Sequence, residues 1–175
     1  MTKMKFDAPL AKSVGIVAVT ATLLLQSSAF ASSEERYAGF VIDANNGKVL
    51  FSKNADDLRF PASLTKMMTL YMLFDAMRAK RVTLQTPMKV SAYAAARPPT
   101  KLRLKVGSTL TVQEAILGLV TLSANDASVV IAEQLAGSEA AFAQQMTAKA
   151  RQLGMSRTTF RNANGLPNPG QTTTA

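Results

Sequence analysis

Two short stretches of this sequence carry side chains that could perform acyl transfer. Ser63 and Lys66 stand three residues apart, so on a helix they share one face and the amine can reach the hydroxyl. At the N-terminus of such a helix, the dipole favours negative charge developing at Ser63. Burial or a neighbouring cation would lower the pKa of Lys66, which could then act as the base. The alternative is a capping serine followed by a solvated lysine.

The second stretch contains Ser123 and Asn125. A hydroxyl and an amide two residues apart in a loop can face one cleft, where the amide binds a peptide and the hydroxyl passes a proton. The structural alternative is that Ser123 caps the next helix and bonds within a turn. Each spacing is common by chance, so neither pattern is specific when taken alone.

The composition restricts the chemistry further. The 175 residues include no histidine and no cysteine. An imidazole base, a Ser-His-Asp triad, a thiol nucleophile, a disulfide and a Cys/His zinc site are therefore all excluded. Any general base must be Lys, Asp, Glu or Tyr. The net charge of +9, from 20 basic and 11 acidic residues, favours an anionic partner or surface.

The N-terminus has the three-part pattern of a secretory signal peptide. Early lysines are followed by the apolar run 14–25 and by Ala29-Phe30-Ala31, which supplies the small residues that a signal peptidase recognises. The apolar run is shorter than the ~20 residues that a spanning helix needs, although an uncleaved anchor is the alternative. We therefore expect a signal peptide at 1–31, a domain at 32–175, and export to the periplasm or cell envelope.

The elements that must position the two stretches follow from turn and cap patterns. Asn46-Gly47 predicts a β-hairpin between short strands at 38–42 and 48–52. Apolar spacing and capping residues predict helices at 63–80, 112–122, 126–136 and 138–153, with Thr111 and Glu114 forming a capping box and Gly137 and Gly154 as stops. The first of these helices is apolar on most sides, which predicts a central, buried position.

In combination, the motifs are specific. The segment Phe60-Pro61-Ala62-Ser63-Leu64-Thr65-Lys66-Met67-Met68-Thr69 closely resembles the nucleophile segment of serine-type D-alanyl-D-alanine carboxypeptidases, the low-molecular-weight penicillin-binding proteins. Leu122-Ser123-Ala124-Asn125-Asp126-Ala127 is similar to the second motif of that family. The hairpin at 37–52, Gly154-Met155 and the segment 160–166 also resemble family segments.

The resemblance implies a fold, a reaction and a role for each residue. The fold would be α+β of the β-lactamase/transpeptidase type, with a helical cluster against an antiparallel sheet. Ser63 would be the acylated nucleophile, with its backbone N–H in the oxyanion hole, and Lys66 would be the general base. Ser123 would relay a proton and Asn125 would hold the substrate amide. The substrates would be peptidoglycan stem peptides, β-lactams would acylate the same serine, and no metal or organic cofactor is implied.

The third motif of the family, Lys-Thr-Gly, is absent from these 175 residues. The family carries it on a strand that follows the Asn-Gly-Leu segment, and Ala175 precedes that position. We therefore expect the N-terminal part of a catalytic domain, without the later strands, the C-terminal β domain or the segment that contacts the membrane. Such a chain would be inactive by itself.

Two other functions are considered. A class A β-lactamase shares Ser-x-x-Lys, but its second motif is Ser-Asp-Asn, whereas residue 124 is alanine and no deacylating glutamate motif is found. A non-catalytic module that binds anionic envelope polymers would use Arg97, Lys101, Arg103 and Lys105 around Pro98-Pro99. Nucleic-acid binding is disfavoured, because the chain has an export signal and its basic residues lack interleaved aromatics.

Overall fold

The computed structural model describes residues 37–175. The predicted signal peptide and the cleavage position after Ala31 lie outside these residues. The chain divides into two compact units, the first ending at Ala55 and the second comprising Asp56–Ala175. The two units are described separately.

The first unit contains a β-hairpin, as the sequence predicts. Strands β1 (Gly39–Ile42) and β2 (Val49–Lys53) pair antiparallel, with an irregularity between Val41 and Ile42. Gly47 in the connecting loop has a φ of 73°, a left-handed conformation that glycine adopts without steric cost. The Asp43 carboxylate accepts a hydrogen bond from the Asn45 N–H and thereby stabilises the turn.

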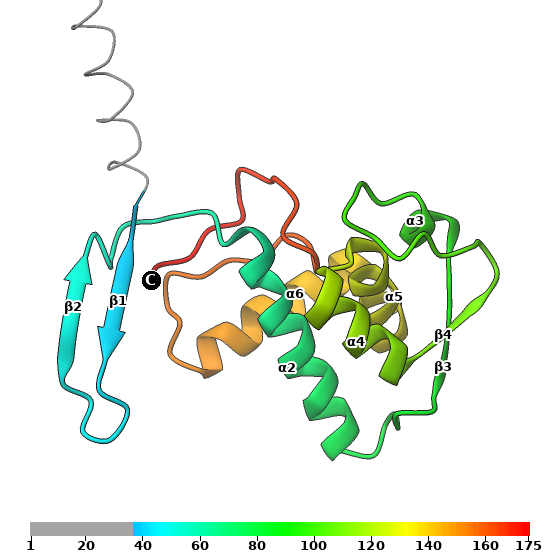
Figure 1. The fold of residues 1–175 in the computed structure, drawn as a ribbon, viewed down its shortest axis with the longest axis horizontal. Coiled ribbons are helices and arrows are strands. Elements are labelled where there is room, and N and C mark those ends of the chain that lie inside the picture. Colours follow the sequence, from blue (N-terminus) through cyan, green and yellow to red (C-terminus); the bar gives the residue numbers. More distant parts are fainter. Residues whose placement is uncertain (1–36) are drawn as a thin grey trace, which may run out of the picture. The chain divides into compact units, whose positions relative to one another are not determined.

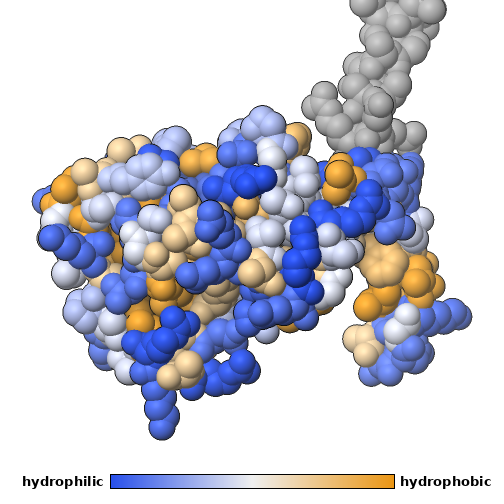
Figure 2. Space-filling view, turned by 180° about the vertical axis from the view of Figure 1, so that it is seen from behind, coloured by the Kyte–Doolittle hydropathy of each residue, from blue (hydrophilic) through white to orange (hydrophobic). Residues whose placement is uncertain are grey.

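The apolar side chains of the hairpin are exposed, and Figure 2 shows hydrophobic atoms at its surface. They are Phe40, Val41, Ile42, Val49, Leu50 and Phe51. A two-stranded hairpin is marginally stable in water by itself, because it cannot bury both of its faces.

The second unit is a helical cluster built around α5 (Figure 1). Its helical elements are η1 (Ala62–Leu64), α2 (Thr65–Arg78), α3 (Ala92–Ala95), α4 (Val112–Leu122), α5 (Asn125–Ala136) and α6 (Glu139–Gln152). Helix α5 packs against α2, α3, α4 and α6, and its residues from Asn125 to Ala132 are all buried. The start of α5, which belongs to the second sequence motif, therefore lies inside the cluster.

The helix boundaries predicted from capping residues are confirmed. Thr111 and Glu114 form the capping box at the start of α4, and Ser138 caps α6. Gly137 ends α5 in the left-handed conformation, with a φ of 78°. These ends depend on local hydrogen bonds, which explains why the sequence predicts them well.

A second small sheet was not predicted. Strands β3 (Pro87–Lys89) and β4 (Thr109–Thr111) pair antiparallel, in addition to the one hairpin that the sequence predicts. Each strand has three residues, too few for an alternating pattern to stand out. Met88 and Leu110 are cross-strand partners, and their burial in the hydrophobic core is what the local pattern does not reveal.

The expectation that the helix beginning at Ser63 is buried on most sides is wrong for one face. Leu73 and Ala76 of α2 are fully buried, whereas Met67, Tyr71 and Phe74 are exposed, Met67 by 68%. Apolar residues on several sides of a helix predict burial only where neighbouring elements cover each side. Among residues 37–175, no helix is long and apolar enough to cross a membrane.

Candidate active site

The candidate nucleophile, Ser63, lies in the tight turn η1 that leads into α2. Its side chain is exposed, while Pro61, two residues earlier, is buried. Ala62 has a φ of 47°, a left-handed conformation that alanine adopts at an energetic cost. Gly165 packs directly on this peptide, because a Cβ placed on it would lie 1.9 Å from the Ala62 carbonyl oxygen. The position of Ser63 therefore depends on a glycine distant in the sequence.

Lys66, the second residue of α2, is buried, with 4% of its surface exposed. Its Nζ donates hydrogen bonds to Asn125 Oδ1 at 2.8 Å and to the Asn164 backbone oxygen at 2.6 Å. The alternative of a solvated lysine is therefore wrong. Burial lowers the pKa of Lys66 to about 8. An amine with this pKa is partly neutral near pH 8 and can accept a proton.

Asn125, the first residue of α5, is held from two directions. Its Nδ2 donates to the carbonyl oxygens of Pro98 (3.0 Å) and Pro99 (3.2 Å). Its backbone N–H donates to the carbonyl of Thr100 at 2.8 Å. The orientation of the amide is thereby fixed with its oxygen toward Lys66.

Ser123 adopts a different local role from a helix N-cap. It is the C-cap residue of α4, with a left-handed φ of 56°, and Ala124 occupies the N-cap position of α5. Its carbonyl accepts a hydrogen bond from Thr100 Oγ1 at 3.1 Å. Within the described part of the chain, its hydroxyl makes no hydrogen bond, so it is available to a ligand or water.

The four predicted residues are thus brought together to different extents. Lys66 and Asn125 are in direct contact. Ser63 precedes Lys66 by one turn, yet no hydrogen bond between the two side chains is found within residues 37–175. Catalytic hydrogen bonds are often long or poorly aligned in enzymes without substrate and tighten when the substrate binds.

The segment 160–171 completes the surroundings of Lys66. Thr69 Oγ1 donates to the Ala163 carbonyl at 2.7 Å, and Gln171 Nε2 donates to Thr65 Oγ1 at 3.2 Å. Together with the bond from Lys66 to Asn164, these contacts fix the segment to α2. The resemblance pointed to the segment 160–166 but gave Asn164 no role. Its contribution is a backbone carbonyl, which leaves no signature in residue type.

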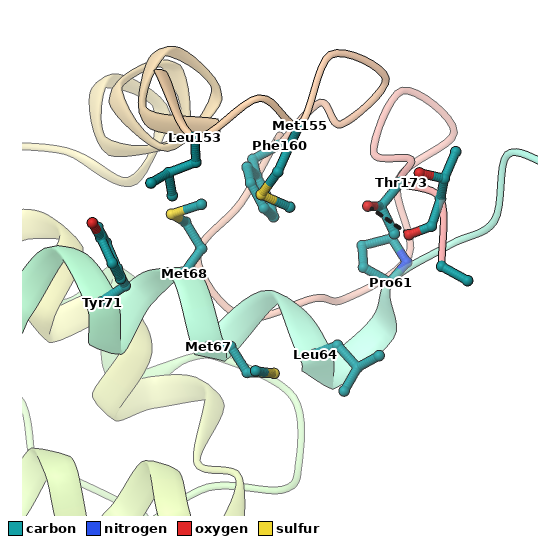
Figure 3. Close-up of a pocket in the computed structure, with 11 residues that line it drawn as sticks. Pro61, Leu64, Met67, Met68, Tyr71, Leu153, Met155, Phe160 and Thr173 are labelled. Carbon is teal, nitrogen blue, oxygen red and sulfur yellow. Dashed lines mark hydrogen bonds between the residues drawn. The ribbon is translucent and has the colours of Figure 1, made fainter. Parts of the chain in front are cut away.

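An apolar pocket of about 480 Å³ adjoins the first turns of α2 (Figure 3). Pro61, Leu64, Met67, Met68, Tyr71, Leu153, Met155, Phe160, Thr173, Thr174 and Ala175 line it. Leu64 is the last residue of η1 and Met67 lies on α2, and the side chain of Phe160 reaches the pocket from the segment after α6. The pocket carries no charged side chain, so it offers apolar contact area and no acid–base group.

The sequence match to known proteins decides the family. Residues 28–175 match the family described as D-alanyl-D-alanine carboxypeptidase. This chain belongs to that family. Within the carboxypeptidase family it is similar to DacF of Bacillus subtilis, with 34% identity over 143 residues, which are 82% of this chain and 37% of that protein. The chain therefore spans little more than a third of the length of this relative.

Solved carboxypeptidase structures share the fold. A D-alanyl-D-alanine carboxypeptidase DacD from Francisella tularensis matches with a TM-score of 0.76 and 36% identity, covering 79% of this chain and 33% of that one. Penicillin-binding protein D2 from Listeria monocytogenes, solved in an ampicillin-bound form, matches with a TM-score of 0.63 and 31% identity. That match covers 78% of this chain and 56% of the other. The α+β fold of the penicillin-binding proteins, represented here by its N-terminal part, is therefore confirmed.

Proposed function

We propose that this chain supplies the nucleophile and base of a serine-type D-Ala-D-Ala carboxypeptidase that removes the terminal D-alanine of peptidoglycan stem peptides. The observation that carries the proposal is the buried Lys66, which has a lowered pKa and lies one turn beyond an exposed Ser63. Membership of the family supplies the reaction class.

The reaction would proceed in two steps. Neutral Lys66 accepts the Ser63 hydroxyl proton while Oγ attacks the carbonyl carbon of the penultimate D-alanine. Collapse of the tetrahedral intermediate breaks the peptide bond, and the proton held by Lys66 passes through Ser123 to the departing amine, which leaves Lys66 neutral again. Water then attacks the acyl-ester, Lys66 accepts the proton from the water, and the proton returns to Ser63 Oγ.

The site residues of the second motif would act around this centre. The Asn125 side-chain oxygen accepts a hydrogen bond from Lys66 Nζ. Only Ala124 separates Asn125 from Ser123 in the sequence. Our expectation that Asn125 also binds the substrate amide requires one of its polar atoms to exchange an internal partner. The Nδ2 atom, which donates to the Pro98 and Pro99 carbonyls, would turn from one of them to the substrate, and Oδ1 would keep its hydrogen bond from Lys66 Nζ.

β-Lactams would acylate Ser63 in the same way as the peptide. The Listeria relative solved with ampicillin supports this proposal. The Lys-Thr-Gly motif is absent from residues 1–175, and the match covers only 37% of B. subtilis DacF. Acylation is therefore expected to require that further segment, because losing one oxyanion donor alone slows a reaction by roughly 10²–10³.

Export to the periplasm or cell envelope is part of the proposal. It depends on the signal-peptide pattern of residues 1–31 and on the location of peptidoglycan itself. Residues 32–175 would then form the mature part of the catalytic domain.

The test uses this chain joined to the part of B. subtilis DacF that follows the matched region, hereafter the completed chain. A fluorescent penicillin should label it covalently, with the adduct at Ser63 by mass spectrometry. Ser63→Ala should abolish the label and the release of D-alanine, and Lys66→Ala should reduce both nearly as far. Labelling that persists in Ser63→Ala would disprove the assignment, and a folded completed chain with no labelling would favour the non-catalytic basic module.

A further inference from the structure

A buried glutamate outside the proposed catalytic set is connected to Lys66 through one residue. Glu139 is the first residue of α6 and has 6% of its surface exposed. Its Oε1 accepts hydrogen bonds from the Ala163 N–H at 3.0 Å and from Asn164 Nδ2 at 2.9 Å. The backbone oxygen of the same Asn164 accepts the bond from Lys66 Nζ at 2.6 Å.

The remaining contacts of this cluster are also satisfied. Glu139 Oε2 accepts a hydrogen bond from the Tyr93 hydroxyl at 2.7 Å, and this bond raises the pKa of Tyr93. Asn164 Oδ1 accepts from the Leu166 N–H at 2.9 Å. The side chain of Asn164 therefore has a partner at each end, and its rotation would break two hydrogen bonds.

We propose that Glu139 is a positioning residue for the acyl-transfer reaction, acting by holding Asn164 so that its backbone carbonyl faces the Lys66 amine. Glu139 is the first residue of α6, so the helix holds its backbone in place. Its carboxylate in turn holds Ala163 and Asn164, two consecutive residues of a segment without regular secondary structure. A backbone carbonyl in such a segment would otherwise be free to turn away. The effect of Glu139 on the reaction rests on the proposed function of Lys66 as the base. Its effect on the position of the Lys66 amine does not.

A positioning role by hydrogen bonding differs from a role of the negative charge. Both bonds toward the Lys66 side go to the single oxygen Oε1, and an amide oxygen can accept the same two bonds. Glu139→Gln therefore keeps the positioning contacts, with its NH₂ group toward the Tyr93 oxygen, while removing the charge. Glu139→Ala removes both.

The first experiment needs no enzymatic activity. The pKa of Lys66 is measured by NMR in the full chain with isotope-labelled lysine, using Lys66→Met to assign the signal. In Glu139→Ala the released segment admits water to the amine, so the pKa of Lys66 should rise toward that of a free lysine, by about one unit. In Glu139→Gln the value should match that of the parent chain.

The second experiment measures penicillin acylation rates in the completed chain. Glu139→Ala and Asn164→Ala should each slow acylation by about tenfold to a hundredfold, and the double variant should be no slower than the slower single variant. Glu139→Gln and Tyr93→Phe should stay within about threefold, because the contacts to Ala163 and Asn164 persist. Glu133→Ala, which removes a glutamate of α5 that bonds Ser91, is the matched control and should leave the rate unchanged.

The outcomes separate this inference from the proposed function. An unchanged or lower pKa of Lys66 in Glu139→Ala would overturn the positioning role whether or not the chain is acylated. Equal effects of Glu139→Gln and Glu139→Ala would show that the negative charge of Glu139 acts, and would also overturn the positioning role.

Should Glu139→Ala fail to fold, as judged by circular dichroism, Asn164→Ala alone must give the rise in the pKa of Lys66 and the loss of acylation rate. A parent completed chain that is never acylated would contradict the proposed function and leave the pKa comparison intact.

Discussion

The Nζ of Lys66 donates a hydrogen bond of 2.6 Å to the backbone carbonyl of Asn164, a residue 98 positions later in the chain. This contact joins the first helix of the second unit to the segment that follows its last helix. The amine is thereby buried between α5 and that segment, and burial is what lowers its pKa. The proposed base is therefore made by tertiary packing of a residue whose side chain is ordinarily charged and solvated.

We predict that the stability of the chain depends on the titration of Lys66. The pKa is about 8 in the folded chain and the ordinary value of 10.5 applies when unfolded. Between these values the unfolded state binds more protons, so the free energy of unfolding rises with pH from about 8 to 10.5. Urea unfolding should show this rise in the parent chain and lose it in Lys66→Met. The control Lys80→Met, which removes an exposed lysine, should retain it.

A second prediction concerns Gly165. Gly165→Ala should destabilise the chain strongly and slow acylation of the completed chain, because the new Cβ would overlap the Ala62 carbonyl and push the peptide before Ser63. Gly154→Ala is a matched control: Gly154 has a similar φ, 81° against 87°, and no atom within 4 Å of the new Cβ. The control should show only the backbone cost, about 1–2 kcal/mol, in thermal and urea unfolding. Equal losses in the two variants would refute the close packing on Ser63.

The buried carboxylate of Asp126 should be essential to the segment that holds Asn125. It accepts hydrogen bonds from the Leu102 and Leu104 N–H groups, at 3.0 and 3.2 Å. Asp126→Asn places an amide donor against one of these N–H groups, which we expect to cost about 1–3 kcal/mol of unfolding free energy. Asp56→Asn, at an exposed position, should change stability by less than about 0.5 kcal/mol. A loss of similar size in both would contradict the role of Asp126.

Processing of the N-terminus gives a prediction independent of the site. Cleavage after Ala31 should leave a mature chain that begins at Ser32, and N-terminal sequencing of the exported protein checks this. Ala31→Asp, which places a charged side chain at the cleavage position, should leave the precursor uncleaved. A mature protein that retains Met1 would show that residues 1–31 serve as an anchor.

We also predict that residues 32–175 expressed alone remain unlabelled by fluorescent penicillin. Ser63, Lys66, Ser123 and Asn125 are all present in this piece. Labelling would fail because the piece does not contain the strand that carries Lys-Thr-Gly in the family. The exposed Met67 and Phe74 of α2, together with the exposed apolar faces of the hairpin, should make this piece prone to aggregation. A stoichiometric adduct at Ser63 by mass spectrometry would show that the strand carrying Lys-Thr-Gly is dispensable for acylation.

Local patterns in the sequence determined much of this protein. The hairpin at Asn46-Gly47, the capping box at Thr111 and the stop at Gly137 all depend on contacts within a few residues, and the structure confirms each. The motif residues Ser63 and Lys66 could be selected because the resemblance to a family supplied the context that their spacing lacks. Residue type and short-range spacing were sufficient for the hairpin, the capping box and the helix stop.

Tertiary structure alone decided how the site is held. The burial of Lys66, its contact with the Asn164 carbonyl, and the Pro98 and Pro99 carbonyls that fix Asn125 join segments far apart in the chain. Backbone carbonyls have the same chemistry at every residue, so the sequence cannot mark which one becomes a ligand of the amine. The sequence did not predict the exposed side of α2 for a related reason. An apolar side chain favours burial, but the sequence does not show whether a neighbouring element covers it.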